Sequence, residues 1–378
     1  MKVRRLALLV AILAAFQSPL AGEGEATPQA NSGLETQQKP KGAETGNSDP
    51  EDDFQRLSGL PFASYSEETK IEYGGVLIIF FRPVKGGKNV SAMDILLMGT
   101  QEKQFELRIT PDFFLLADHL RIEAELEVAK WPGDYFERSS SGSSDPIASF
   151  DKTYVSGEAA FEFNYGLPAR LPIRYGAVVK GEHRTSDFDD IDEGKSRRDG
   201  TFGGGGYLLN YNSLDNENWP SRGAYAAFEQ TFFGGEFAFH TEELDLRTYI
   251  TPFFSTTFAL GLLWQQSRGD VPYGYLSGPD GTRRFRGVDS GVWNDKQATI
   301  IQFEIRQPLF WRFAGTIFAE GLKSGAYFSK MLDNDLHYAV GFGGRLALNK
   351  SEKLYGRADL SLVDMKDIGF TIDLREAF

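Results

Sequence analysis

The sequence predicts an all-β chain, a transmembrane antiparallel β-barrel of about 16 strands. Three observations predict it: a leading segment typical of export, long stretches in which apolar and charged residues alternate, and aromatic residues at the ends of those stretches. The composition agrees, with 41 glycines, 31 phenylalanines and a mean hydropathy of −0.33. A low mean hydropathy together with many aromatic residues is typical of barrel strands, in which apolar and polar residues alternate.

Residues 1–22 predict a signal peptide. The first five residues form a basic start, an apolar stretch runs from Leu6 to Phe16, and small residues follow at Ala21 and Gly22. The apolar stretch is too short to span a bilayer, so we expect a cleaved signal, the alternative being an uncleaved anchor. No later run of about eighteen apolar residues follows, so no transmembrane helix is expected.

Residues 23–60 predict a disordered periplasmic linker. They are rich in Glu, Gly, Asn and Pro, and they contain few large apolar side chains. Such a segment cannot bury enough surface to offset the entropy lost on ordering, and it leaves no room for a folded soluble domain. We therefore expect the barrel to occupy residues 61–378.

Two-residue alternation begins near Ile71 and is clearest over residues 119–128. There Leu120 and Leu126 fall on an apolar face, whereas Arg121 and Glu125 fall on a charged face. The same pattern recurs in residues 105–110, 161–165 and 244–247. Period two, with one apolar and one charged side, indicates strands whose two faces meet different surroundings.

Two architectures fit this alternation. In a soluble sandwich the apolar faces pack together, whereas in a membrane barrel they meet lipid and the charged faces line the lumen. The export signal and strands of roughly ten residues favour the barrel. Aromatic residues near strand ends, as in an interfacial girdle, favour it too. They are Phe80, Phe81, Trp131, Tyr135, Phe136, Phe232, Phe233, Phe310 and Trp311.

The strand count follows from length. About 310 residues, at roughly twenty for each strand and its connection, give about sixteen strands. Ten alternating segments precede residue 266 and five follow residue 295, with Gly74 and Gly75 at the start of the first. An antiparallel barrel with both ends on one side needs an even number, so we expect one more strand, near residues 130–150 or 184–202.

The longest predicted loop, residues 267–292, carries the most informative motif. It contains Arg283-Arg284-Phe285-Arg286-Gly287, and polar-face glutamates follow on the next two strands at Glu304 and Glu320. A guanidinium can bind two carboxylates at once, and glycine allows close backbone approach. The alternative is that the loop arginines only solvate an extracellular hairpin.

With these motifs the sequence resembles the BamA/TamA superfamily of outer-membrane barrels, the bacterial surface antigen family. The resemblance covers the barrel only, because the periplasmic POTRA domains of that family are absent. It implies that Phe285, Arg286 and Gly287 fold back into the lumen as a loop anchor, where the arginine meets Glu304 and Glu320. Val288 departs from the family, which usually has an aromatic residue there.

A second stretch, Tyr211 to Gly223, is similar to a family turn motif. It departs from that motif at Asn212 and at Leu214, where an arginine is usual. At the other end of the barrel, alternating residues close on a terminal aromatic. This resembles the insertion signal by which outer-membrane barrels are recognised. The residues of the predicted signal are Gly369, Phe370, Ile372, Leu374 and Phe378.

Composition argues against several other functions. Zero cysteines exclude disulfides, thiolate metal sites and a cysteine nucleophile, and a net charge of −13 disfavours nucleic-acid binding. The four histidines lie in separate segments without a recognisable serine partner. The acidic run from Asp187 to Gly194 lacks the EF-hand register. We therefore predict no enzyme activity, no cofactor and no metal site.

The predicted function is to assist the insertion or translocation of proteins, or of lipid, at a Gram-negative outer membrane through a weakened seam between the first and last strands. The alternative, favoured by the missing periplasmic domains, is a passive pore or structural barrel. Expected partners are outer-membrane lipid and lipopolysaccharide, the barrel-assembly machinery during biogenesis, and a client protein. No nucleic-acid partner is expected, and the barrel is predicted to be a monomer.

Overall fold

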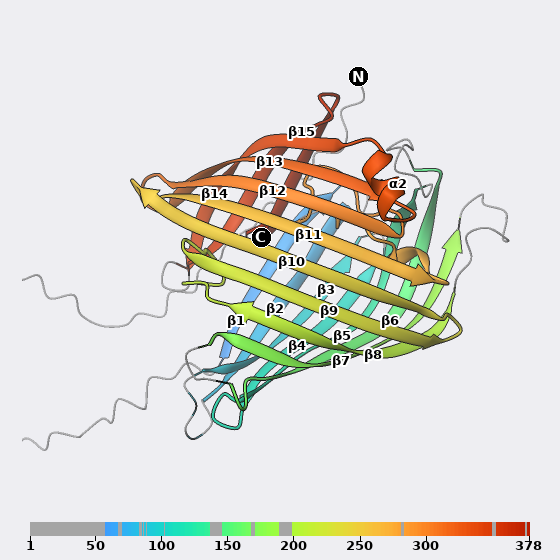
Figure 1. Ribbon diagram of the computed structural model, residues 1–378, viewed down its shortest axis with the longest axis horizontal. Helices are drawn as coiled ribbons and strands as arrows, with labels where there is room; N and C mark the ends of the chain where they lie inside the picture. The colour runs from blue at the N-terminus through green and yellow to red at the C-terminus, as the bar shows by residue number, and fades with distance from the viewer. Residues whose placement is uncertain are drawn as a thin grey trace, which may run out of the picture.

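Sixteen antiparallel strands are present in the described part of this computed structural model (Figure 1). The structure describes residues 57–66, 70–82, 85, 87, 89–101, 103–136, 146–167, 171–188, 199–280, 283–349, 353–374 and 376–378. The strands are β1 (Leu57–Ser66), β2 (Lys70–Phe81), β3 (Ser91–Thr100), β4 (Phe105–Leu115), β5 (Leu120–Tyr135), β6 (Ala148–Phe163), β7 (Ile173–Phe188), β8 (Gly200–Asn212), β9 (Gly223–Gly235), β10 (Phe239–Phe253), β11 (Thr256–Gly269), β12 (Gln297–Pro308), β13 (Phe313–Gly325), β14 (His337–Asn349), β15 (Leu354–Val363) and β16 (Asp367–Leu374).

Each strand pairs with the next one along the chain, so the sheet runs from β1 to β16 without a crossover. The hairpins alternate between two ends of the sheet. We call them the loop end, which carries the β11–β12 connection, and the turn end, which carries the β10–β11 turn. That turn is two residues long, with positive φ at Phe254 and Ser255, as a type I′ hairpin turn requires. This arrangement confirms the predicted all-β antiparallel class.

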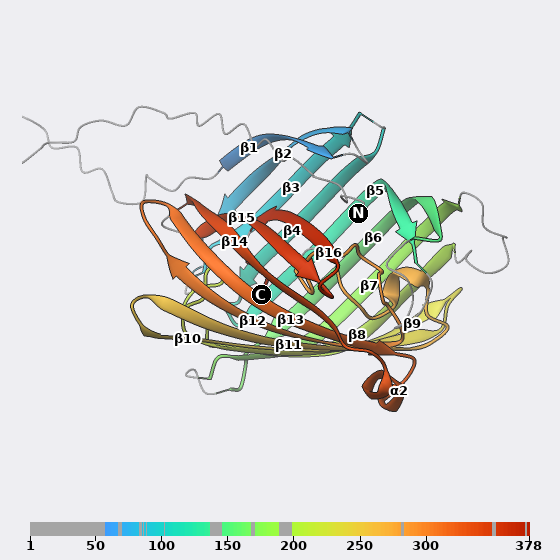
Figure 2. The ribbon, with the colours of Figure 1, turned by 90° about the horizontal axis from the view of Figure 1, so that it is seen from above.

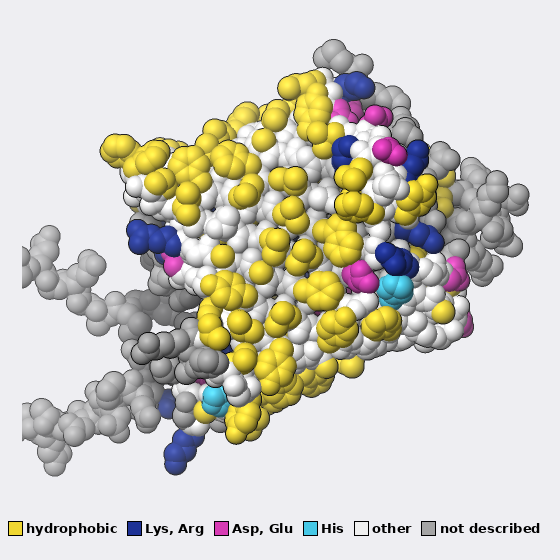
Figure 3. Space-filling model, viewed as in Figure 1, with side chains coloured by type: hydrophobic (Ala, Val, Ile, Leu, Met, Phe, Trp, Pro, Cys, Tyr) yellow, Lys and Arg dark blue, Asp and Glu magenta, His cyan; other side chains and the backbone are white. Residues whose placement is uncertain are grey.

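The alternation in sequence separates an inner from an outer face. On β5, Leu126 points outward and is 55% exposed, whereas its neighbour Glu127 is buried on the inner face. Figure 3 shows hydrophobic side chains spread over the outer face, with charged side chains gathered toward the ends of the strands. A long apolar helix of membrane-spanning length is not found among the described residues. Two short helices are described instead, the 3₁₀ turn η1 (Tyr273–Tyr275) and α2 (Phe328–Asp333).

The first and last strands form the two edges of the sheet. Within the described ranges no residue pair joins β1 to β16, although every strand is paired with its neighbour along the chain. The two edges are seen in Figure 2, where β16 and the C-terminal end lie within the curve of the sheet. Both edge strands therefore leave backbone donors and acceptors without a strand partner inside this sheet.

The structure corrects the position of the uncounted strand. It is β1, and not a strand near residues 130–150 or 184–202, since ten strands lie between Lys70 and Gly269 as expected. The strand begins at Leu57, within the stretch predicted as linker, and Gly74 and Gly75 consequently lie inside the second strand, β2. Its alternation is weak, with Gly59 and Pro61 in the middle, which explains why the pattern missed it. The predicted signal peptide and most of the predicted linker lie outside the described residues.

Candidate functional site

The connection between β11 and β12, residues 270–296, packs against the inner face of the sheet. A bridge between Ser277 and Asp295 closes its base, and beyond that bridge Phe285 and Arg286 are both fully buried. Arg286 contacts inward side chains of strands that follow the loop in sequence, and Phe285 belongs to a buried cluster with Phe136 and Leu263. The predicted long loop is therefore a lumen loop, and not a solvated hairpin.

Arg286 lies among three carboxylates. Its Nη1 donates to Glu304 Oε2 at 2.8 Å and to Asp359 Oδ2 at 3.1 Å, and its Nε donates to Glu320 Oε1 at 2.8 Å. The Arg286 backbone N–H also donates to Glu320 Oε2 at 2.6 Å. The guanidinium carbon lies 3.5 Å from the ring centroid of Phe318, so the cation also faces an aromatic ring. The structure thus brings Arg286, Glu304 and Glu320 together.

Further arginines extend this cluster across the inner wall. Glu304 also accepts from Arg306 Nε at 2.7 Å, and Asp359 accepts from Arg357 Nη1 at 2.9 Å. Arg345 reaches Glu304 at 3.6 Å and also pairs with Asp359. We call the whole set the arginine–carboxylate network; it consists of Arg286, Arg306, Arg345, Arg357, Glu304, Glu320, Asp359 and Glu376. Its formal charges cancel, which is the condition under which buried ions remain ionised at tolerable cost.

The residues on either side of Arg286 allow the loop to pack closely against the inner face of the sheet. Phe285 has a positive φ of 64° and packs against Trp293 edge-on, with ring centroids 6.0 Å apart. Gly287 has a φ of 92°, and a Cβ there would collide with the Ser361 hydroxyl. Only glycine meets both conditions at that position without strain. Val288 packs against the hydrophobic cluster that contains Phe285.

A second loop arginine is bound in the same way. Arg284 is buried, donates to Gln302 Oε1 at 2.9 Å and forms an ion pair with Asp245 of β10. Arg283, in contrast, is exposed. Two arginines therefore attach the loop to strands on both sides of β11.

The sequence analysis did not identify the other members of the network, which are Arg306, Arg345, Arg357, Asp359 and Glu376. Their signal is alternation of charged residues on one face, as in Arg357, Asp359 and Ser361 of β15 or Glu304 and Arg306 of β12. Opposite charges two residues apart share a strand face, which marks a paired lumen wall. A search of each strand for opposite charges two residues apart, combined with the positions of the loop arginines, would have identified these residues.

The C-terminal residues lie differently from the predicted insertion signal. β16 ends at Leu374, and Glu376 to Phe378 turn into the lumen, where Phe378 is 4% exposed. Its ring packs against Tyr249 of β10, and its main-chain oxygen accepts from Arg306 Nη2 at 2.8 Å. Phe370 remains partly exposed on the outer face, and the side chains of Ile372 and Leu374 lie outside the described residues. The terminal aromatic is thus inside the barrel and does not continue the outer face of the strand.

Gly369, also assigned to the insertion signal, contacts the lumen loop. A Cβ built at Gly287 would lie 3.3 Å from the Gly369 Cα, and a Cβ at Gly369 would overlap the Gly287 backbone. Backbones approach this closely only where neither residue has a side chain. The loop anchor and the last strand are consequently in direct contact.

The stretch from Tyr211 to Gly223 forms the β8–β9 turn at the turn end. Asp215 accepts hydrogen bonds from the backbone N–H groups of Ser221 at 2.8 Å and Arg222 at 3.1 Å. Partial burial opposes ionisation, but these bonds and the Ser221 hydroxyl hold the pKa of Asp215 below its ordinary value. Trp219 of the same turn packs against Tyr355 of β15, with the two rings tilted and their centroids 4.4 Å apart.

Comparison with known proteins gives a family and a fold. The model of the Omp85 superfamily domain matches residues 86–297, more than half of the chain. None of the curated proteins compared has a matching sequence. Among solved structures, the chain is similar to BamA from Haemophilus ducreyi lacking POTRA domains 1–3, with a TM-score of 0.54 and 11% sequence identity. The match covers 84% of this chain and 68% of that chain.

A second similar structure is CdiB from Acinetobacter baumannii. The TM-score is 0.52 at 11% sequence identity, and the match covers 84% of this chain but only 60% of that chain. At these identities the likeness concerns the fold of the barrel.

Proposed function

This chain belongs to the Omp85 superfamily, whose barrels are bacterial outer-membrane proteins, and from that premise we propose that it assists the insertion or translocation of proteins, or of lipid, at the outer membrane. The family resemblance stated from the loop motif is confirmed. The specific role rests on one observation, the pair of unjoined edges at β1 and β16.

Open sheet edges are costly in a lipid bilayer, because backbone groups there have no water to bind. An incoming strand can satisfy them by adding to the sheet. The edge strands β1 and β16 are ten and eight residues long, shorter than most of the others. A client strand, or lipid moving past the seam, would therefore use this place rather than the lumen.

The lumen loop supports a route at the seam. The arginine–carboxylate network joins the loop to β12, β13 and β15, so part of the lumen is occupied by the protein itself. Phe378 packs on the inner wall from the last strand's own tail. A substrate passing through the lumen centre would have to displace both.

The proposed setting follows from the same surface. The apolar outer face seen in Figure 3 would contact outer-membrane lipid and lipopolysaccharide, and the barrel-assembly machinery would insert the chain after export by its signal peptide. We propose that the barrel acts as a monomer on a client protein. Omp85 barrels are transporters or assembly proteins, and no enzymatic step is part of this proposal.

The experiment uses the lack of cysteine in the chain. Cysteine pairs scanned along β1 and β16 would report where the edges meet, since each engineered disulfide is then the only one present. Purified barrel in liposomes should accelerate insertion of an unfolded outer-membrane barrel protein, and oxidation of a seam pair should abolish this while reduction restores it. Equal insertion by oxidised and reduced barrels would contradict the proposal.

A passive pore is the second candidate, and one observation favours it. The inner wall from β5 to β10 is hollowed by a polar cavity that the loop leaves unfilled. Steady conductance in planar bilayers, combined with no acceleration of client insertion, would support the pore. Small intermittent openings with active insertion would support the assembly role.

A further inference from the structure

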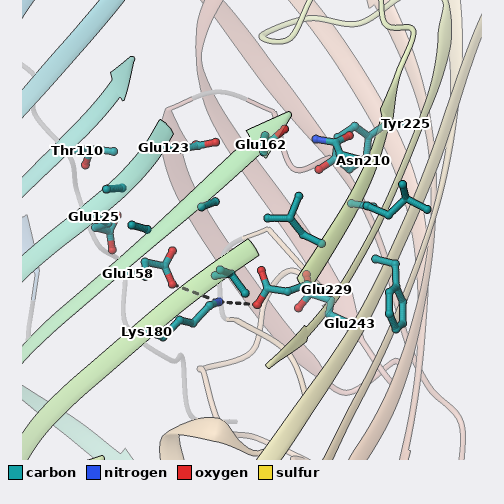
Figure 4. Close-up of a pocket in the computed structure, with 18 residues that line it drawn as sticks. Thr110, Glu123, Glu125, Glu158, Glu162, Lys180, Asn210, Tyr225, Glu229 and Glu243 are labelled. Carbon is teal, nitrogen blue, oxygen red and sulfur yellow. Dashed lines mark ion pairs between the residues drawn. The ribbon is translucent and has the colours of Figure 1, made fainter. Parts of the chain in front are cut away.

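One side of the lumen wall contains a cavity whose charged lining residues are almost all carboxylates. This cavity, of about 280 Å³, lies against the inner faces of β5 to β10 (Figure 4). Small or aliphatic side chains such as Ala160 and Ala227 provide the space. Its charged lining consists of one lysine, Lys180, and six glutamates: Glu123, Glu125, Glu158, Glu162, Glu229 and Glu243. The lining therefore carries a strong excess of negative charge.

Lys180 shows how the wall binds an ammonium group. Its Nζ lies 2.8 Å from Glu229 of β9 and 3.3 Å from Glu158 of β6, so one cation bridges two strands across the cavity wall. Figure 4 shows the side chain extended between these two glutamates. The remaining four glutamates of the lining have no such ammonium partner within the described residues.

Three guanidinium groups lie near the cavity lining: Arg174 is close to Glu162 and donates to the Asp118 carbonyl oxygen at 3.0 Å, and the other two are divided among several carboxylates. Arg121 makes a two-point contact with Asp112, at 2.8 and 3.0 Å, and reaches Glu123 at 3.2 Å and Glu162 at 3.7 Å. Arg108 is shared in the same way, and it reaches Glu125 only at 3.9 Å. These two arginines therefore do not balance the charge of the cavity lining.

Glu162 provides an independent sign of a missing donor. Its side chain is 5% exposed, and its Oε2 has no hydrogen-bond partner among the described residues. The Oδ1 of Asn210, which lines the same cavity, is likewise unpartnered in that part of the chain. Both orphaned atoms are acceptors, and buried acceptors without donors are costly. A ligand with several N–H donors would satisfy them.

The arrangement fits an organic cation better than a metal ion. No three carboxylate or imidazole groups of the described residues stand close enough together to ligate a metal. The acidic groups are instead distributed along a wall, from Glu162 and Asn210 to Glu243. We propose that this cavity binds a linear polyamine, a flexible alkyl chain with two or more ammonium groups, with one ammonium at Glu162 and Asn210 and another at Glu243.

The test is equilibrium binding to the complete folded barrel in detergent, with spermidine as the ligand. Spermidine should bind saturably, at one molecule per barrel, and at least tenfold more tightly than butylamine, which has a single ammonium. Glu162→Gln keeps the shape of the side chain but removes its charge, so it should weaken spermidine at least tenfold. Asp333→Asn, the same change of charge on α2 outside the lumen, should leave affinity unchanged.

A second variant keeps the proposal testable if Glu162→Gln fails to fold. Glu243→Gln alters a residue exposed to the lumen, and it should weaken spermidine severalfold in a barrel that retains its heat-modifiable mobility. Equal affinities for spermidine and butylamine would overturn the proposal, as would wild-type affinity in both glutamine variants. Displacement of spermidine by stoichiometric Mg²⁺ would also overturn it, because it would identify a metal site. Tighter binding of a trilysine peptide than of spermidine would do the same, because it would identify a peptide site.

Discussion

Gly287 of the lumen loop lies against Gly369 of the last strand, backbone to backbone. A Cβ built on Gly369 would overlap the Gly287 Cα, and a Cβ on Gly287 would meet the Ser361 hydroxyl and approach the Gly369 Cα to 3.3 Å. The loop that carries Arg286 is thus seated on β16, one of the two edges of the sheet. The position of the edge strand and the position of the loop depend on each other.

Substitution of either glycine should separate these two elements. Gly369→Ala is expected to destabilise the folded barrel by about 1–3 kcal/mol, the usual cost of overpacking a filled contact. Gly287→Ala should cost more, because its φ of 92° also disfavours any side chain. Urea midpoints followed by heat-modifiable mobility would measure both. Gly344→Ala is the control, since a Cβ there would meet no atom within 4 Å; a similar loss in all three variants would contradict this account.

Arg286→Ala should leave Glu320 as the carboxylate most affected. Glu304 and Asp359 keep other arginines, whereas Glu320 would keep two neutral donors, the Gln302 amide at 2.9 Å and the backbone N–H of residue 286, and would lose its cation. Breaking a buried pair from one side costs about 3–5 kcal/mol, so assembly should fall or conductance should rise as the loop loosens. Arg286→Lys should rescue only in part, because the fork of donors is lost.

The same site offers a double-mutant test. Adding Glu320→Gln to Arg286→Ala removes the uncompensated charge and should recover part of the stability, whereas Glu304→Gln should recover little. Arg283→Ala, three residues upstream and exposed, is the matched control and should change the urea midpoint by less than about 0.5 kcal/mol. Equal rescue by the Glu304 and Glu320 substitutions would show that Glu320 is not specially dependent on Arg286.

Phe378→Ala should act on the interior of the barrel. Its ring packs on Tyr249 and beside Gly261, so truncation leaves a cavity and is expected to cost about 3–5 kcal/mol in the free energy of unfolding. Gly261→Ala, which would place a methyl 3.0 Å from the ring, should weaken the same contact with the terminal residue intact. Refolding of purified chain in detergent measures this directly.

The insertion signal predicts a different pattern for the same residue. If the terminal aromatic is read mainly during biogenesis, Phe378→Ala should lower the amount assembled in cells but leave the urea midpoint of purified barrel unchanged. Phe370→Ala, on the outer face, serves as the comparison for a residue without interior contacts. Stability loss confined to Phe378→Ala would support the interior role.

Asp215 gives a pH-dependent prediction at the turn end. Its pKa is lowered in the folded protein, so the unfolded chain binds the proton more readily. The stabilisation of the β8–β9 turn is then complete above the unfolded pKa, near 3.8, and is lost as pH falls through the lower folded value. The protection of the Ser221 and Arg222 amides from exchange, relative to an unstructured chain at the same pH, should fall below about pH 4. Asp215→Ala should show low protection at every pH, and an unchanged protection profile in that variant would rule out the carboxylate as the cause.

The sequence predicted the parts of this structure that depend on alternation. In strands such as β5, Leu126 lies outside and Glu127 lies inside. The difference between lipid and lumen is enough to specify the two faces of such a strand. The strand β1 escaped prediction because Gly59 and Pro61 interrupt its pattern. Arg286 and its two glutamates were found through a motif, whereas Asp359, 73 residues away from Arg286, could be found only by placing β15 beside the loop. The inward turn of Phe378 depends on Arg306 and Tyr249, which no local pattern connects with the C-terminal end.

The lumen loop also constrains the order in which the chain can fold. The three carboxylates that bind Arg286 are 18, 34 and 73 residues further along the sequence, on β12, β13 and β15. Contacts of large sequence separation form late, because chain entropy must be lost before they can stabilise anything. The loop therefore cannot reach its final place until the penultimate strand has joined the sheet. A chain stalled before β15 would expose an unsatisfied arginine and a free loop, a state that a protease or chaperone could distinguish from the finished barrel.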